Sequence, residues 1–122
     1  MKTSILYKGK RLLIEVKKTN FLTKGLGLTF RTKNTQNLIF DFSKPVTWQG
    51  NLTSIFVFFP FLALWLDNRN RVIAVKIVNP FTISISLKKP FYKIIEVPFN
   101  SKNEAILRNF IKKGHFNRYF RR

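Results

Sequence analysis

An uncharged run, IFVFFPFLALWL from Ile55 to Leu66, stands in a chain with 23 Lys and Arg against 5 Asp and Glu. A helix that crosses a bilayer needs about 20 apolar residues. This run is shorter, contains Pro60 and ends at the polar turn sequence Asp67–Asn70. It therefore indicates the core of one globular domain. Because proline cannot donate to a strand ladder, we expect two buried strands that are separated near Pro60.

Short apolar segments rich in β-branched and aromatic residues recur along the rest of the chain. Many alternate apolar with polar residues and are bounded by Pro, Asn, Gly or Lys, which is typical of strands. The predicted strands are Arg11–Lys18, Asn37–Lys44, Ser54–Phe59, Leu62–Leu66, Arg71–Val78, Phe81–Lys89 and Tyr92–Phe99. The sequence thus predicts a mainly β fold, a compact domain like a β-sandwich or barrel.

Two segments have the features of helices. Residues 19–26, in the N-terminal third, favour one short helix that Gly25 or Gly27 would end. Near the C-terminus, Ser101 and Glu104 have the spacing of a capping box, and Gly114 is placed to end the helix. The apolar face of this second helix comprises Leu107, Phe110 and Ile111.

The net charge of +18 exceeds what solubility requires, since about 2 to 8 suffices for a small domain. Residues 1–33 hold nine cations and one acid, residues 34–101 seven and three, and residues 102–122 seven and one. Like charges repel one another and destabilise the folded chain unless a polyanion neutralises them. Basic flanks around an apolar middle therefore indicate a nucleic-acid partner.

We expect one β-rich domain over residues 1–114 and a basic aromatic tail over residues 115–122. In the tail, aromatic rings would stack on unpaired bases and guanidinium groups would bind phosphates. An alternative is that the aromatic residues of the tail pack back on the domain. The predicted RNA-binding residues are Lys8, Lys10, Arg11, Lys17, Lys18, Lys24, Arg31, Lys33, Lys112, Lys113, His115, Phe116, Arg118, Tyr119, Arg121 and Arg122.

RNA is favoured over DNA because no segment has the pattern of a DNA-recognition helix. Basic ends on a small β core are, moreover, typical of proteins that bind ribosomal RNA. We therefore predict a non-enzymatic, shape-reading RNA-binding protein, associated by analogy with ribosomal RNA and neighbouring ribosomal proteins. The chain has no cysteine and no apolar secretion signal at its start, so a cytoplasmic location is expected.

The sequence offers few groups for catalysis or metal binding. It has one His, no Cys and five scattered carboxylates, whereas proton transfer and metal coordination need such groups together. Glu15 and Glu96 fall within predicted strands, where ion pairing with Lys or Arg accounts for them. We predict no catalytic residue, no metal site and no cofactor.

Four segments, in order, resemble the uncharacterised family catalogued as domain of unknown function 192. They are KGLGLTFR (24–31), LIFDFSKPVTW (38–48), VFFPFLALWLDNRNRVIAV (57–75) and PFYKIIEVP (90–98). With their flanks they cover roughly residues 17–114. The resemblance implies a compact, mainly β sandwich-like domain and no established activity. Residues 53–56 and Leu62 replace a polar cluster of that family with less polar side chains, so a pocket that the cluster serves in relatives would be lost here.

Two other functions remain open. One is a small-molecule or peptide-binding β-sandwich like those relatives, whose basicity reflects the composition of the host, because Lys, Asn, Ile and Phe are abundant. The other is attachment to a membrane surface, which needs Phe59, Phe61 or Trp65 exposed for insertion, although the strand pattern buries these rings.

Overall fold

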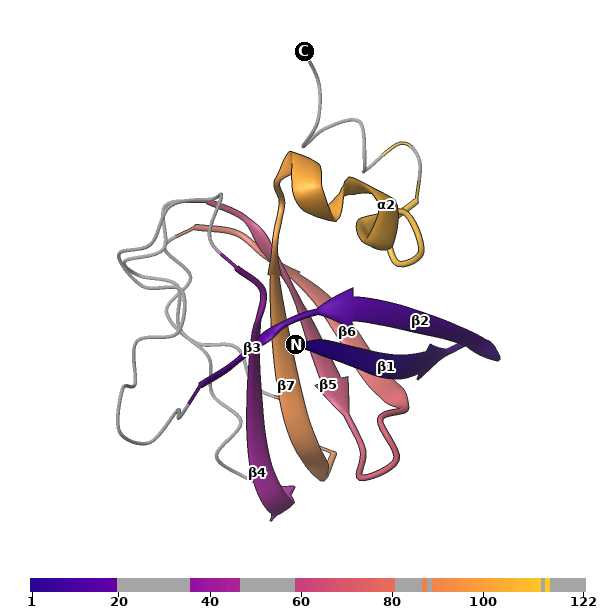
Figure 1. Cartoon of the computed structure of the whole chain (residues 1–122), viewed down its shortest axis with the longest axis vertical. Helices are drawn as coiled ribbons and strands as arrows, with labels where there is room; N and C mark the ends of the chain where they lie inside the picture. The colour runs from indigo at the N-terminus through magenta and orange to yellow at the C-terminus, as the bar shows by residue number, and fades with distance from the viewer. Residues whose placement is uncertain (20–35, 47–58, 81–86, 88, 113, 115–122) are drawn as a thin grey trace.

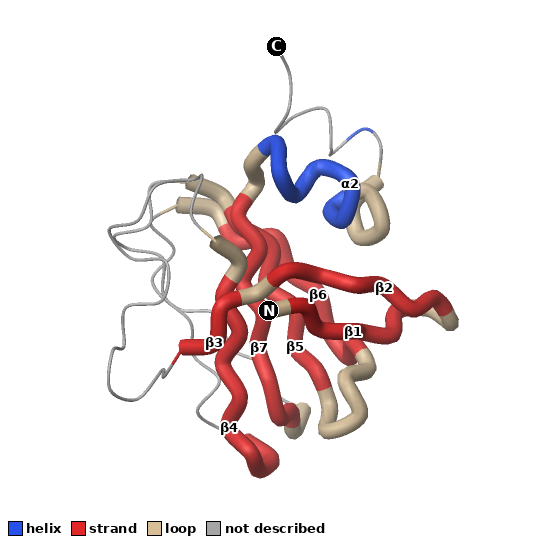
Figure 2. The backbone as a smooth tube through the Cα atoms, in the orientation of Figure 1, coloured by secondary structure: helices blue, strands red, loops and turns tan. Residues whose placement is uncertain are grey.

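The computed structural model describes residues 1–19, 36–46, 59–80, 87, 89–112 and 114 of the chain. Strands dominate this part, which confirms the mainly β fold (Figure 1, Figure 2). The strands are β1 (Lys2–Tyr7), β2 (Lys10–Glu15), β3 (Lys17–Thr19), β4 (Leu38–Val46), β5 (Phe61–Leu66), β6 (Val72–Val78) and β7 (Phe91–Pro98). A 3-10 turn, η1 (Ser101–Asn103), leads into a short helix, α2 (Glu104–Leu107).

The described strands form two sheets and do not close into a barrel. The larger sheet has the order β3-β4-β7-β5-β6, and its pairs are antiparallel apart from the parallel pair of β3 with β4. The smaller sheet is the antiparallel hairpin of β1 and β2. This hairpin crosses one face of the larger sheet, with α2 beside it (Figure 1).

Strand β5 accounts for the second half of the uncharged run. All six of its residues are buried, because β5 lies between β7 and β6. Successive side chains of a strand point to opposite faces, so an apolar run fills two cores at once. One cluster contains Leu62, Leu64 and Leu66, and the other contains Phe61, Ala63 and Trp65. The strand therefore needs apolar residues at every position.

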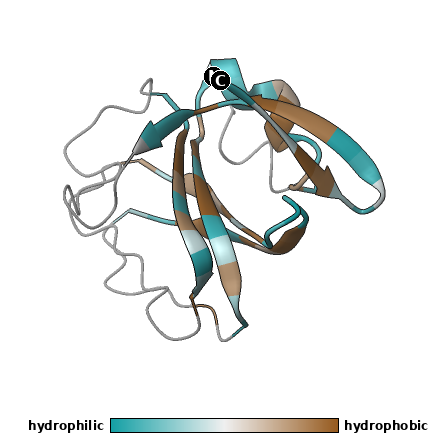
Figure 3. Ribbon diagram, turned by 60° about the horizontal axis from the view of Figure 1, so that its bottom comes forward, coloured by the Kyte–Doolittle hydropathy of each residue, from teal (hydrophilic) through white to brown (hydrophobic). Residues whose placement is uncertain are grey.

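The first of these clusters is covered by the hairpin and the helical segment. Ile5, Leu12 and Ile14 pack from the hairpin, and Leu107 and Ile111 pack from the segment that contains α2. Hydrophobic residues follow the hairpin strands and give way to hydrophilic residues near its turn (Figure 3). Burial of a large apolar side chain contributes about 1.5–3 kcal/mol, so this contact is sufficient to fix the hairpin on the sheet.

The aromatic residues of the uncharged run that the structure describes do not face the solvent. Phe59, Phe61 and Trp65 are 5%, 1% and 0% exposed, so insertion of these rings into a lipid surface is incompatible with the fold. Within the part of the chain that the structure describes, no helix combines the length and the apolar character needed to cross a membrane.

Several element boundaries differ from those expected. The predicted strand Arg11–Lys18 is two strands that leave Val16 between them, because the chain passes there from the hairpin to the larger sheet. Strand β1 was not predicted at all. The proposed strands Phe81–Lys89 and Ser54–Phe59 lie almost wholly outside the described residues. The expected helix at residues 19–26 also lies outside them, except for Thr19, which is the last residue of strand β3 and not helical.

The expected capping box at the C-terminal helix is wrong. The side chain of Asn100, one residue before Ser101, accepts a hydrogen bond from the backbone N–H of Asn103 at 3.1 Å. The regular helix then ends at Leu107 and not at Gly114. Of the residues expected on the apolar face of the helix, Leu107 lies in α2 and is buried. Ile111, also buried, and Phe110, which packs against the same cluster, follow the helix instead.

The turn between β1 and β2 is a tight turn within the sequence YKGKR, residues 7–11. Lys8 and Gly9 both have positive φ, of 50° and 76°, which is the backbone of a type I′ hairpin turn. Glycine adopts this conformation without strain and lysine does so rarely. The turn closes the β1–β2 register at the pair of Tyr7 with Lys10 and sets Lys8 at the exposed tip.

Asp67 stabilises the turn between β5 and β6, as the sequence DNRN predicts. Its Oδ1 accepts the backbone N–H groups of Arg69 and Arg71, both at 2.9 Å, and its Oδ2 accepts Nε of Arg71 at 2.6 Å. Burial alone would raise the pKa of Asp67. The hydrogen bonds from Arg71 and Arg69 and the charge of Arg71 outweigh burial and hold the pKa below its ordinary value of 3.8.

This lowered pKa predicts a difference between the acid stabilities of the protein and its Asp67→Asn variant. A carboxylate whose pKa is depressed by folding stabilises the fold above its unfolded pKa, and that stability is lost as pH falls through the folded pKa. The free energy of unfolding, measured in urea, should therefore fall more steeply below pH 3.8 for the natural protein than for Asp67→Asn. Parallel curves for the two proteins would contradict this role of Asp67.

Candidate functional site

An open groove of about 1150 Å³ lies between β2 and the segment that contains α2. One wall is continuous chain, residues 11–18, which comprises most of β2 and the start of β3. The opposite wall is Lys102, Ala105, Ile106 and Asn109. These four recur at the spacing of one helix face, which explains why they turn toward the groove together. Met1, Gln36, Asn37, Asn100 and Asn103 complete the lining.

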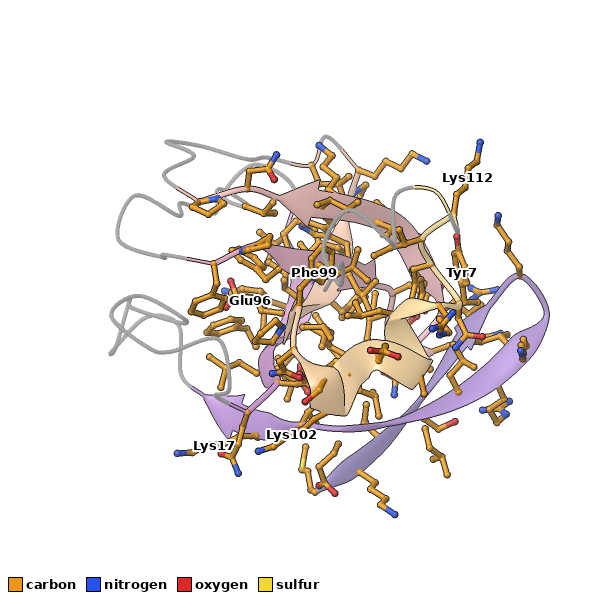
Figure 4. The ribbon with its side chains drawn as sticks, turned by 90° about the horizontal axis from the view of Figure 1, so that it is seen from above. Tyr7, Lys17, Glu96, Phe99, Lys102 and Lys112 are labelled. Carbon is orange, nitrogen blue, oxygen red and sulfur yellow. The ribbon has the colours of Figure 1, made fainter. Side chains whose placement is uncertain are left out.

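The rim of the groove is strongly cationic. Arg11, Lys17, Lys18 and Lys102, called the rim cations below, all line the groove and are exposed to solvent. Lys17 and Lys102 lie on the same side of the molecule, although they come from β3 and from η1 (Figure 4). Long-range folding thus concentrates positive charge from distant parts of the sequence on one surface, which is suited to a polyanion.

Glu15, the acidic residue of the groove lining, is already paired. Its carboxylate lies 2.8 Å from the α-amino group of Met1, and this amine also donates to the backbone oxygen of Val16 at 3.0 Å. The hydrogen bond from the amine, together with the charges of the amine and of Lys2, outweighs the opposing effect of desolvation and lowers the pKa of Glu15. The predicted ion pairing of Glu15 therefore uses the amine and not a Lys or Arg side chain.

The tip of the hairpin is docked on the segment after α2. The ring of Tyr7 lies 4.5 Å from the ring of Phe110, centroid to centroid, and Nζ of Lys8 lies 5.3 Å from the centroid of Tyr7. Nζ of Lys10 donates to Oδ1 of Asn109 at 3.1 Å. Asn109 in turn donates to the carbonyl oxygens of Ala105 and Ile106, so one side chain caps the helix and holds the hairpin.

The other end of the groove is closed by a buried pair of amide side chains. Nδ2 of Asn37 donates to Oδ1 of Asn103 at 3.0 Å, and Nδ2 of Asn103 donates to Oδ1 of Asn37 at 2.8 Å. The remaining donors reach the carbonyl oxygens of Glu15 at 2.9 Å and Pro98 at 2.7 Å. Asn37 and Asn103 are 8% and 6% exposed, so these bonds satisfy polar groups that would be costly to bury unpaired.

The structure brings together one part of the predicted RNA-binding set. Arg11, Lys17 and Lys18 line the groove, and Lys8 and Lys10 lie at the exposed hairpin tip. Lys112 is exposed but lies across the helical segment from Lys17 and Lys102 (Figure 4). The other predicted residues lie outside the described part of the chain: Lys24, Arg31, Lys33, Lys113, His115, Phe116, Arg118, Tyr119, Arg121 and Arg122.

Lys102 was missed by sequence reasoning. The signal was present, because Lys102 has the helical spacing to Ala105, Ile106 and Asn109 that defines the second wall. The pairing of Asn37 with Asn103 had no local signal, since the two residues are 66 positions apart.

The described residues offer no cluster of three or more His, Cys, Asp or Glu side chains for a metal ion. Glu96 is buried on β7, at 5% exposure, and does not line the groove. The chemistry of the groove is therefore that of cationic and amide hydrogen-bond donors beside apolar side chains, which suits binding of an anion.

Comparison with protein-family models and with curated protein sequences finds no match for this chain. Two solved structures share its fold. One, a protein of unknown function from Novosphingobium aromaticivorans DSM 12444, is 14% identical with a TM-score of 0.67, over 88% of this chain and 78% of that one. The other, a proposed transcription regulator from Sinorhizobium meliloti 1021, is 16% identical with a TM-score of 0.63, over 84% and 81%. At these identities the likeness concerns the fold alone.

The amide pair predicts strong coupling between Asn37 and Asn103. Each single substitution, Asn37→Ala or Asn103→Ala, leaves a buried amide without its partner and should lower the free energy of unfolding by about 1–3 kcal/mol. The double variant removes both groups and should be more stable than the sum of the two losses predicts, by about 0.5–3 kcal/mol.

Urea denaturation of the four proteins measures this coupling. Gln36→Ala is the control, because Gln36 is the exposed neighbour of Asn37 and its substitution should change stability by less than about 0.5 kcal/mol. Simple additivity of the two Asn substitutions would show that the amide pair does not hold the groove.

Proposed function

We propose that this protein is a non-enzymatic RNA-binding protein of the cytoplasm, associated with ribosomal RNA, that carries basic surfaces on a compact β-sandwich-like scaffold. The observation that carries the proposal is the convergence of Arg11, Lys17, Lys18 and Lys102 on one groove. With a net charge of +18, the folded chain gains most from a partner that brings many phosphates at once.

The kinds of side chain at this surface favour contacts to the sugar–phosphate backbone. Sequence-tolerant binding of single strands relies on aromatic rings on which bases stack. The groove lining contains no aromatic residue among the described positions, and Tyr7 at the hairpin is engaged with Phe110. Lys and Arg side chains bind phosphates without reading bases. Recognition of folded RNA by its shape follows from this arrangement.

The rim cations predict a steep dependence of RNA affinity on salt. If about eight phosphates are neutralised, the slope of log affinity against log salt should be near −6 to −7. The double variant Lys17→Ala/Lys102→Ala should make the slope shallower by about 1.4–1.8 and weaken binding, because two phosphate contacts are lost. Fluorescence anisotropy with a labelled ribosomal RNA fragment at several salt concentrations measures both quantities.

The matched control is Lys44→Ala/Lys89→Ala, which also removes two exposed charges but from residues outside the groove lining. It should leave the salt slope almost unchanged. Duplex DNA serves as a competitor, because one structural neighbour is a proposed transcription regulator. Absence of RNA binding at physiological salt, or equal effects of the two double variants, would refute the proposed interface.

A further inference from the structure

The groove exposes one edge of a β-strand. In an antiparallel ladder, residue pairs alternate between those that exchange hydrogen bonds and those whose backbone groups point outward. Val16 and Met1 exchange two backbone hydrogen bonds, which fixes this alternation along the register of β1 with β2. Leu12 and Ile14 therefore pair with β1, whereas the N–H and C=O groups of Arg11 and Leu13 point away from it.

The outer edges of the two hairpin strands differ in their hydrogen bonding. The edge of β1 is occupied, because Leu6 donates its N–H to the carbonyl of Asn70 at 2.9 Å and the carbonyl of Ser4 accepts Nδ2 of Asn70 at 3.1 Å. Strand β2 lies between β1 and α2 (Figure 1). Its outer edge, on the side away from β1, lies along the groove. At its end the carbonyl of Glu15 accepts the side chain of Asn37 at 2.9 Å, as it would accept a neighbouring strand.

The side chains beside this edge are those of a peptide groove. Leu13 and Met1, at 67% and 62%, are the large apolar residues that the described part of the chain exposes, and both line the groove. Ile106 and Ala105 face them from the helical wall. An extended peptide between a strand edge and a helix gains affinity from backbone hydrogen bonds and specificity from such side-chain contacts.

The charge around the edge selects the occupant. The rim cations stand at both ends of the exposed edge, while Glu15 is paired with the amine of Met1. A second copy of the same edge would bring like charges together, which blocks edge-to-edge pairing of this chain with itself. A strand that carries carboxylates would be attracted by the same charges.

We propose that the free edge of β2 binds an extended acidic segment of a partner protein, which adds to the hairpin as a third strand. The edge from Arg11 to Glu15 spans about five residues at roughly 3.3 Å each. The outward groups of Arg11 and Leu13 are those offered to the segment, because the carbonyl of Glu15 already accepts Asn37. Carboxylates at alternate positions of the segment meet the rim cations on one face, and the apolar residues between them, which point to the opposite face, contact Ile106. The same rim cations are proposed to bind RNA, so the peptide and RNA would compete for the groove, and the backbone contacts of the peptide are tested with a different probe.

The first experiment is amide hydrogen exchange by NMR on the full chain, with and without the peptide Glu-Thr-Glu-Val-Glu-Thr-Glu. The amides of Arg11 and Leu13 should exchange fast in the free protein. At a peptide concentration ten times Kd, only about one molecule in eleven is free. The exchange rates of these two amides should therefore fall by roughly tenfold. The amides of Leu12 and Ile14, which already pair with β1, should be protected in both states.

Two peptides with N-methyl groups test the backbone contact without a change of charge. A methyl group on one set of alternate residues removes the N–H groups that face β2, and a methyl group on the other set leaves them free. One isomer should therefore bind roughly as well as the parent peptide, and the other should lose at least tenfold in affinity. A peptide with Lys in place of each Glu should not bind.

On the protein, Leu13→Pro removes one outward N–H, while the ladder with β1 does not use that group. Affinity for the peptide should fall roughly tenfold, whereas Leu13→Thr, which keeps the N–H, should change it only a few-fold. If Leu13→Pro does not fold, as judged by circular dichroism, the exchange data on the natural protein decide.

Unchanged exchange of Arg11 and Leu13 at saturating peptide would overturn the proposal. So would equal binding of the two N-methylated isomers, or protection of the same amides by oligouridylate in place of the peptide. The decisive readouts concern backbone contacts along β2, which the RNA proposal does not use, so failure of the peptide proposal can be distinguished from failure of RNA binding.

Discussion

The reciprocal amide pair of Asn37 and Asn103 is the interaction on which the groove depends. It joins the end of β2, the start of β4 and the end of β7 to the first turn of the helical segment, through bonds to Glu15 and Pro98. In a buried site each of these amide groups would be costly without its partner. The pair therefore favours one arrangement of these four chain segments over any looser packing of apolar side chains, and the groove walls keep their spacing.

The layered core explains why the hairpin and the helix meet on the same face of the sheet. Apolar residues at every position of β5 require cover on both faces, and the hairpin with Leu107 and Ile111 supplies it on one of them. Two short elements placed side by side on one face of a sheet leave a gap between their backbones. That gap is the groove, so the site follows from the way the core is closed.

Much of the fold could be predicted from local sequence patterns. Alternating β-branched residues located β4, β6 and β7 to within a few residues, and Pro60 and Asp67 marked the ends of β5, because these signals act over two to four positions. Strand β1 escaped notice because Lys2–Tyr7 mixes polar and apolar residues without a long apolar run. The cap at Asn100 was misplaced by one residue, because Ser101 and Asn100 are both good capping residues.

The site was less accessible to sequence reasoning than the fold. Composition and charge clustering indicated a polyanion partner and placed Arg11, Lys17 and Lys18 among the predicted RNA-binding residues. Their meeting with Lys102 depends on contacts between residues far apart in the chain, which no local pattern encodes. The free edge of β2 is also a property of topology, because a strand sequence does not state which of its two sides will find a neighbour.

The hairpin is anchored along its whole length: by Asn70 on its outer side, by Asn109 near its tip and by Asn37 at its base. A hairpin held in this way loses little conformational entropy when a partner binds. The ordering cost of association then falls on the partner alone. Encounter should consequently proceed in a single step, at a rate set by diffusion and charge and without a preceding rearrangement of this protein.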